Sequence, residues 1–203
     1  MITGPKYKIA RRLGAPIFEK TQTQKYALSL EKKLKNKRGF SKPKSEFGTQ
    51  LNEKQKARFI YGLSEKQFSN YVKEAISKKT SHAPQLIFDF LESRLDNIVY
   101  RLGFTTTRSG SRQMVTHGHM KVNGRKVDVP SMRLKIGDKI EINDRSANKP
   151  LFNGLDEKMK NASVPSWLKL DGAKRMGEVQ GKPIYTKTDN MFDLNTVIEF
   201  YSR

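Results

Sequence analysis

The chain has 203 residues, enough for one large or two small domains with a hydrophobic core. It carries 40 Lys and Arg against 20 Asp and Glu, and this net charge of +20 predicts a polyanionic partner, with nucleic acid as the first candidate. The absence of cysteine excludes disulfides and thiolate zinc sites, and no apolar run approaches the ~20 residues of a membrane span, so we expect no membrane partner.

Half of the excess positive charge lies in residues 1–50, which hold 13 basic and 3 acidic side chains. Apolar residues are sparse there and glycine and proline punctuate the segment, so we predict no independent core. Two interpretations stay open: a disordered basic tail, or an extended arm that becomes ordered on phosphates, with one short helix in "SLEKKLKNK". The cations that would contact RNA are Lys6, Lys8, Arg11, Arg12, Lys32, Lys33, Lys35, Lys37, Arg38, Lys42 and Lys44.

Two helices are predicted next, in "TQLNEKQKARFIYGLSEKQFSNYVKEAISKK". Apolar residues recur at intervals of three to four, the pattern breaks near Gly62, and Ser64 is a candidate N-cap for the second helix. Lys54, Lys56 and Arg58 lie on the opposite face of the first helix and are candidate RNA contacts.

A longer helix is predicted from Pro84 to Gly103, because apolar residues repeat with helical spacing along this stretch. In one continuous helix, Arg94 and Arg101 would lie on nearly the same face. That face is either solvated or in contact with RNA.

The following stretch predicts a helix start that suits a phosphate. Ser109 or Ser111 would cap a short helix from Arg112 to His117, and Arg108 and Arg112 would add charge to its exposed N–H groups. Asn123-Gly124 then predicts a hairpin, and Gly137-Asp138 a turn into another strand. The candidate RNA contacts of this module are Arg94, Arg108, Arg112, Gln113, His117, His119, Lys121 and Asn123.

His117 and His119 could be considered as a metal pair. Two imidazoles without a nearby carboxylate or thiol make an incomplete site, so we predict no metal and favour RNA contact or packing for both. Near the C-terminus, Asp193 is a candidate cap for a short helix in "DLNTVIEFYSR", which would need a surface to dock on.

The spacing of "RLD", "RLGF", "TR", "RQMV", "HGH", "VNG" and "GD" resembles the RNA-binding module of many RNA-associated proteins. With "TGPKYKIARRLG", "VPSWLKLD" and "IEFYSR", the resemblance extends over nearly the whole chain to the small-subunit ribosomal protein number four family. It implies an α+β fold in which an inserted domain interrupts a helical domain. The implied parts are an extended basic arm at 1–48, the helical domain at 49–90 and 190–203, and a second domain at 91–189 whose module, at 94–144, combines a helix-turn-helix with a small antiparallel or mixed sheet.

The same resemblance implies a function. The protein would bind small-subunit ribosomal RNA at a junction of several helices in the 5′ domain and nucleate assembly of the subunit. Lys42 and Lys44 match residues that grip messenger RNA at the entry channel. Glu199 and Tyr201 would lie where the neighbouring ribosomal protein number five is contacted, an interface linked to decoding accuracy. The chain departs from many bacterial members in lacking the four cysteines of a zinc knuckle.

The alternative function is an RNA-modifying or tRNA-charging enzyme fragment with the same module, as in pseudouridine synthases and tyrosyl-tRNA synthetases. "RLD" at Arg94 to Asp96 echoes the synthase signature. However, Asp96 lies in the module's own helix and fewer than 60 residues follow Asp144, so we predict no enzyme, cofactor or small-molecule substrate, and interpret Asp96 as a partner for a nearby Arg or backbone group.

The N-terminus lacks the apolar core of a secretory signal, so we expect a cytoplasmic protein in the small ribosomal subunit. Repression of its own messenger RNA stays open as an additional role.

Overall fold

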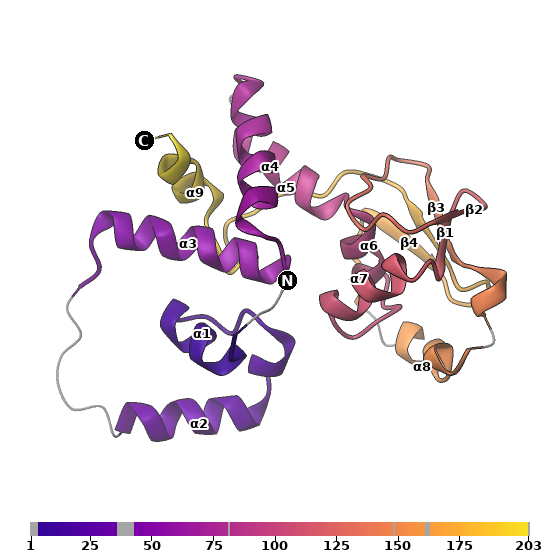
Figure 1. Cartoon of the computed structure of the whole chain (residues 1–203), viewed down its shortest axis with the longest axis horizontal. Helices are drawn as coiled ribbons and strands as arrows, with labels where there is room; N and C mark the ends of the chain where they lie inside the picture. Colours follow the sequence, from indigo (N-terminus) through magenta and orange to yellow (C-terminus); the bar gives the residue numbers. More distant parts are fainter. Residues whose placement is uncertain (1–3, 36–42, 81, 148, 161–162, 203) are drawn as a thin grey trace. The chain divides into compact units, whose positions relative to one another are not determined.

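The computed structural model describes residues 4–35, 43–80, 82–147, 149–160 and 163–202. The chain forms two compact units, one from Met1–Ile87 with Tyr185–Arg203 and the other from Phe88–Ile184 (Figure 1). Helices fill the described part of the first unit, and the second combines helices with a sheet. The predicted α+β class is confirmed.

The described part of the first unit is built from helices, one of which begins after a capping residue, Ser64. The elements of this unit are α1 (Lys6–Leu13), η1 (Glu19–Thr21), α2 (Gln24–Lys35), α3 (Glu46–Ile60), α4 (Glu65–Ser77), α9 (Leu194–Tyr201) and the beginning of α5 (Ala83–Glu92). The Ser64 Oγ accepts from the Gln67 N–H at 3.3 Å, and the Gln67 side chain accepts from the Ser64 N–H at 3.4 Å. This capping box confirms Ser64 as the N-cap of α4.

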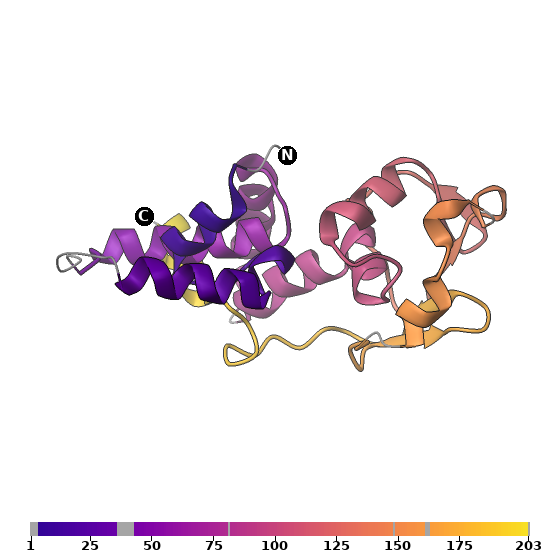
Figure 2. The ribbon, with the colours of Figure 1, turned by 90° about the horizontal axis from the view of Figure 1, so that it is seen from below.

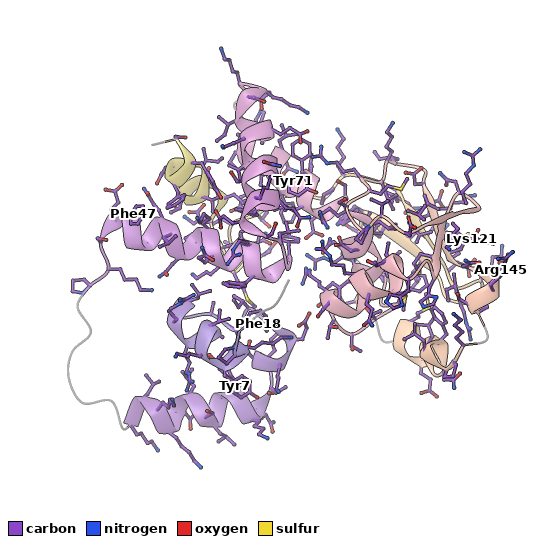
Figure 3. All side chains as sticks on the ribbon, in the orientation of Figure 1. Tyr7, Phe18, Phe47, Tyr71, Lys121 and Arg145 are labelled. Carbon is purple, nitrogen blue, oxygen red and sulfur yellow. The ribbon has the colours of Figure 1, made fainter. Side chains whose placement is uncertain are left out.

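The N-terminal quarter is not an extended arm in its described part. Its few apolar residues form a small buried cluster that packs against Phe59 and Ile60 of α3. The members of this cluster are Ala10, Leu13, Ile17, Phe18 and Tyr26. Figure 3 shows Tyr7 and Phe18 among these elements, and the Tyr7 ring lies 5.1 Å from that of Tyr26.

The expectation of an extended arm over 1–48 is therefore wrong for residues 6–35. Sparse apolar residues suffice there because α3 supplies the other half of the packing surface. The short helix expected in "SLEKKLKNK" belongs to the longer α2, and the rest of that stretch, from residue 36, lies outside the described residues.

The C-terminal helix α9 packs against α3 and α4, which are far from it in sequence (Figure 1). The Asp193 side chain accepts from the Asn195 N–H at 2.9 Å, which confirms Asp193 as its cap. Leu194 and Val197 are fully buried. Residues 180–193, which lead to α9, contain no helix or strand (Figure 2). The C-terminal segment thus belongs to the same compact unit as the first part of the chain.

The second unit places short helices against a five-stranded antiparallel sheet of order β2-β1-β3-β5-β4. Its elements are α6 (Leu95–Arg101), α7 (Arg108–Thr116), β1 (Met120–Val122), β2 (Arg125–Val127), β3 (Lys139–Ile142), η2 (Asp144–Ser146), η3 (Pro150–Phe152), α8 (Leu155–Lys160), β4 (Leu168–Asp171) and β5 (Met176–Val179). Asn123 and Gly124 both have positive φ, at 50° and 76°, and the two-residue hairpin predicted there is confirmed.

A glycine allows α6 to approach the sheet closely. A Cβ at Gly177 of β5 would lie 2.3 Å from Cδ1 of Leu102, which is fully buried at the end of α6. Ile140, the cross-strand partner of Gly177, is also fully buried. The core of the second unit therefore lies between this helix and the sheet.

The long helix predicted from Pro84 to Gly103 is two helices, α5 and α6. Between them, Arg94 has extended backbone angles, φ −64° and ψ 137°, and forms a bridge with Arg133. The N–H groups of Leu95 and Asp96, at the start of α6, donate to backbone carbonyls of the 130–132 segment at 2.8 and 3.1 Å. Arg94 and Arg101 therefore do not share a face of one helix.

We predict that Leu194→Ala lowers the free energy of unfolding of the first unit by about 2–5 kcal/mol, because a buried leucine leaves a cavity when truncated. Asn195→Ala, at the exposed neighbouring position, serves as the control and should change stability by no more than about 0.5 kcal/mol. Urea unfolding followed by circular dichroism measures both. Equal effects of the two substitutions would contradict the docking of α9.

Candidate nucleic-acid interface

The helix α7 begins with a basic, well-capped N-terminus. The Thr107 Oγ1 accepts from the Gly110 N–H at 3.1 Å, and the first turn contains no acidic residue. The helix starts at Arg108, four residues before the predicted start. The predicted caps are wrong: Ser109 lies within the helix, and Ser111 is buried with its Oγ donating to the Arg108 carbonyl at 2.8 Å. The positive end of the helix dipole thus coincides with Arg108.

The guanidinium of Arg108 is held in place from two sides. Its Nε donates to the Asn97 Oδ1 at 3.0 Å, and its Cζ lies 4.3 Å from the centroid of the Tyr100 ring. The amide of Asn97 in turn donates to the Glu92 carboxylate at 2.8 Å. Because Arg108 is only half-buried, this chain of contacts orients a guanidinium that still reaches solvent.

Arg112 lies one turn further along α7, close to a second carboxylate. Its Nη1 is 3.8 Å from the Asp96 Oδ2, and its side chain is 34% exposed. Asp96 also receives a two-point contact from Arg94, at 2.9 and 2.6 Å. This pair confirms the interpretation of Asp96 as an arginine partner.

Arg94 itself is 1% exposed, so it is part of the interior and its side chain has no surface to offer a phosphate. Sequence reasoning placed it on a helix surface because the break before α6 was not visible. The neighbouring Arg101 makes a two-point contact with the buried carboxylate of Glu92, at 3.0 and 2.8 Å. Both arginines therefore neutralise acids inside the protein.

In and near the hairpin, the predicted RNA contacts Asn123 and Lys121 take part in side-chain contacts within the protein. Asn123 accepts from the Lys139 N–H at 2.9 Å and donates to Asp138 at 2.8 Å, so it joins two turns. Lys121 is 17% exposed and forms an ion pair with Asp144. Figure 3 shows Lys121 and Arg145 near each other at this end of the sheet. Gln113 and His117 are exposed.

The α3 cations take part in contacts within the first unit. Lys54 is buried, 2.8 Å from Glu65 and 4.3 Å from the centroid of the Phe200 ring. Lys56 lies 2.7 Å from Glu53, and Arg58 donates to the Gln55 side chain at 2.6 Å. Lys54 therefore helps to dock α9.

The cations of the N-terminal segment are mostly at the surface. Lys6 lies 5.5 Å from the centroid of the Phe18 ring, and the Arg11 Nε donates to the Tyr7 carbonyl at 3.2 Å. Among the predicted RNA contacts of this segment, the exposed ones are Lys8, Arg12, Lys32, Lys33, Lys35 and Lys44. Lys37, Arg38 and Lys42 lie outside the described residues.

The two residues expected at a protein interface differ in exposure. Glu199 is exposed, and its carboxylate accepts from the Gln50 side chain at 3.4 Å. The Tyr201 hydroxyl is half-buried and donates to Glu65 at 2.8 Å. Burial, followed by the contact with Glu65, raises the pKa of Tyr201.

The described residues also bear on metal binding and on membrane insertion. Within that part of the chain, His, Cys, Asp and Glu side chains nowhere gather in threes as a metal site would need. Among the helices seen there, none has the length and apolar character to cross a bilayer.

Comparison with known proteins identifies the family. Models of the "Ribosomal protein S4/S9 N-terminal domain" and of the "S4 domain" match residues 1–92 and 93–140. Small ribosomal subunit protein uS4 of Herpetosiphon aurantiacus is 38% identical over 99% of this chain and 98% of its own length. The uS4 protein of Persephonella marina is 39% identical over 98% and 97%, and uS4A of Alkaliphilus metalliredigens 38% over 97% and 96%.

The chain belongs to the uS4 family of small ribosomal subunit proteins. The resemblance drawn from the sequence is thereby confirmed. uS4 proteins are structural rather than catalytic, so the alternative of an enzyme fragment is wrong.

Sequence reasoning missed the residues that orient Arg108 in this uS4-family chain. Asn97 and Tyr100 are three residues apart in α6, a spacing that places both side chains on one face of a helix. The spacing can be recognised in the sequence, but it does not show which residue the two side chains contact. That contact depends on α7 packing against α6, which brings Arg108 to them.

His119 contacts Ser146 through Nδ1 at 2.9 Å and meets the Phe152 ring edge-on. Burial is the main cause that lowers the pKa of His119, and the nearby Lys149, His117 and Lys126 add to the effect. At neutral pH its imidazole is therefore uncharged and suited to hydrogen bonding rather than to ionic contact with phosphate.

We predict that this lowered pKa makes stability depend on pH. Because the unfolded state, with a pKa near 6.5, takes up the proton more readily, the free energy of unfolding should decrease as pH falls from about 7 through 6.5 toward the folded pKa. His119→Gln should reduce this decrease. Urea unfolding at about pH 7.5 and pH 5.5 measures it. An imidazole midpoint at or above 6.5 in an NMR titration would contradict the prediction.

Proposed function

We propose that this uS4-family chain is a structural constituent of the small subunit that binds small-subunit ribosomal RNA at a junction of several helices in the 5′ domain and nucleates assembly there. The observation that carries the proposal is the basic N-terminus of α7. Arg108 and Arg112, one turn apart, meet the positive end of a helix dipole, and Asn97, Tyr100 and Asp96 hold them. Such an arrangement favours a phosphate group.

The N-terminal segment would add contacts of a less specific kind. Its exposed lysines and arginines lie on and around α1 and α2, whose buried apolar residues belong to the cluster that packs against α3. These cations are therefore presented on a folded surface. A cation held on a folded surface loses less side-chain freedom on binding than one on a disordered chain. Spread charges of this kind neutralise phosphates and release counterions.

Two finer roles follow from the resemblance to the family. Lys44 is exposed directly before Ser45, the N-cap of α3, and with Lys42 would contact messenger RNA at the entry channel. The exposed Glu199 and the aromatic pair of Phe47 and Phe200, with ring centroids 5.5 Å apart, would face ribosomal protein number five beside Tyr201. Phe47 is 50% exposed, which suits a contact with a protein neighbour.

We propose a separate role for each of the predicted domains. The segment 1–48 would supply distributed charge, the helical domain at 49–90 and 190–203 the protein contacts, and the inserted domain at 91–189 the oriented phosphate site. Arg94 and Lys54 are not among the RNA contacts that we propose, because both are buried in ion pairs.

We predict that the affinity for a ribosomal RNA fragment containing the 5′ domain falls steeply with salt, by about 0.7–0.9 log units per log unit of salt for each phosphate contact. Replacing both Arg108 and Arg112 by Ala should lower this slope by about 1.4–1.8 and weaken binding. Filter binding at several salt concentrations measures both quantities.

The control is the double substitution Lys169→Ala with Lys174→Ala, which removes the same charge from two exposed positions of the same unit. It should change the slope less. Circular dichroism establishes that both variants are folded. Equal losses of affinity in the two variants would overturn the α7 site, and a salt-independent affinity of the unsubstituted chain would overturn RNA binding altogether.

A further inference from the structure

The second unit contains a cavity of about 450 Å³ that the α7 arginines do not line. Its walls come from α5, α6 and the sheet region and are mainly apolar. They include Phe90, Ile98, Leu134, Trp167, Val179 and Pro183. The volume lies within the range of cavities that hold small aromatic ligands.

Backbone hydrogen bonds tie the walls of this cavity together. The Leu134 N–H donates to the Ser93 carbonyl at 2.9 Å, which joins the segment before β3 to the end of α5. The N–H groups of Gln180 and Gly181 both donate to the Trp167 carbonyl, at 2.9 and 3.1 Å. Because the surrounding backbone is paired in this way, the cavity is preformed, and mainly side chains face a ligand.

The rim of the cavity is basic. Arg133, Lys135 and Lys182 line it against a single carboxylate, that of Asp89, and both lysines are exposed. Beside them Ile136 is 57% exposed. The Arg133 guanidinium lies 4.0 Å from the centroid of the Phe90 ring. An unpaired nucleotide needs an apolar surface for its base and positive charge for its phosphates. The cavity supplies the first, and the guanidinium of Arg133 and the ammonium groups of Lys135 and Lys182 supply the second.

The charge pattern distinguishes a nucleotide from an acidic peptide. A flat base can enter the apolar slot while its flanking phosphates contact the lysines. The Asp89 carboxylate could accept a hydrogen bond from an exocyclic amino group of the base, whereas it would repel the carboxylates of an acidic peptide.

We propose that this cavity receives one unpaired base of ribosomal RNA, with Lys135 and Lys182 on the adjoining phosphates. This inference rests on the proposed function and adds a second RNA contact to the same unit. It also assigns a chemical role to Ile136 and Trp167, which the α7 site does not use. Stacking would accept any base, because every base offers an aromatic face, and Asp89 would favour a base with an exocyclic amino group.

The tryptophan provides a local readout, since Trp167 is the only tryptophan of the chain. The full chain is titrated with an oligoadenylate octamer and with an octamer of the same length and charge that lacks its bases. We expect the oligoadenylate to change the Trp167 emission in a saturable way and to bind about tenfold more tightly than the abasic octamer. Equal binding of the two octamers, or no change in emission, would overturn the proposal.

Two matched variants test the position of the contact. Ile136→Asp places a negative charge at the rim, and Val129→Asp makes the same change at a position that is 51% exposed and does not line the cavity. We expect about tenfold weaker binding of oligoadenylate for Ile136→Asp, and less than about twofold for Val129→Asp. Equal effects would overturn the cavity as the site.

The ribosomal RNA fragment separates failure of this inference from failure of the proposed function. If that fragment binds with a steep salt dependence while Trp167 does not respond, the cavity proposal fails and the proposed function stands. If no RNA binds, both fail. A synthetic hexapeptide with aspartates around Leu-Phe completes the comparison: if it changes Trp167 emission and the octamers do not, a protein partner replaces RNA as the occupant and the proposal is overturned.

Discussion

Two buried carboxylates organise the helix pair of the second unit. Glu92 is 1% exposed and binds Arg101 and Asn97, and Asp96 binds Arg94 and lies close to Arg112. A buried carboxylate without partners would cost several kcal/mol, so these contacts fix where the surrounding cationic groups can lie. In a chain with such an excess of positive charge, the few internal acids hold the arginines of α6 and α7 in defined positions.

In the first unit the acid is exposed and the buried partner is a lysine. Glu65 contacts Lys54 and Tyr201, and Lys54 also lies over the Phe200 ring, so the charge pair joins α9 to α3 and α4. A count of basic residues therefore overstates the charge that is presented to RNA. Exposed cations are found in α1, α2, α4 and β2, whereas Arg108 and Arg112 of α7 are half-buried.

Features encoded by neighbouring residues could be predicted from the sequence. Ser64 caps α4 and Asn123-Gly124 forms a hairpin because their hydrogen-bonding partners lie within a few residues. The break at Arg94 was missed because its partners, the 130–134 segment, lie more than 30 residues away. The helical packing of residues 6–35 was missed for a related reason, since its apolar face is completed by Phe59 and Ile60. In the candidate site, Arg108 and Arg112 could be predicted from the sequence, whereas Asn97 and Tyr100, which orient Arg108, could not.

The division of the first unit between the two ends of the chain has a consequence for biosynthesis. While the nascent polypeptide emerges, everything that the inserted unit requires has been made once Ile184 has been added. The first unit, although it begins earlier, still lacks α9 and its buried Leu194 and Val197 at that moment. Because units tend to fold as wholes, the unit that is translated second is the first to have all of its residues available for folding.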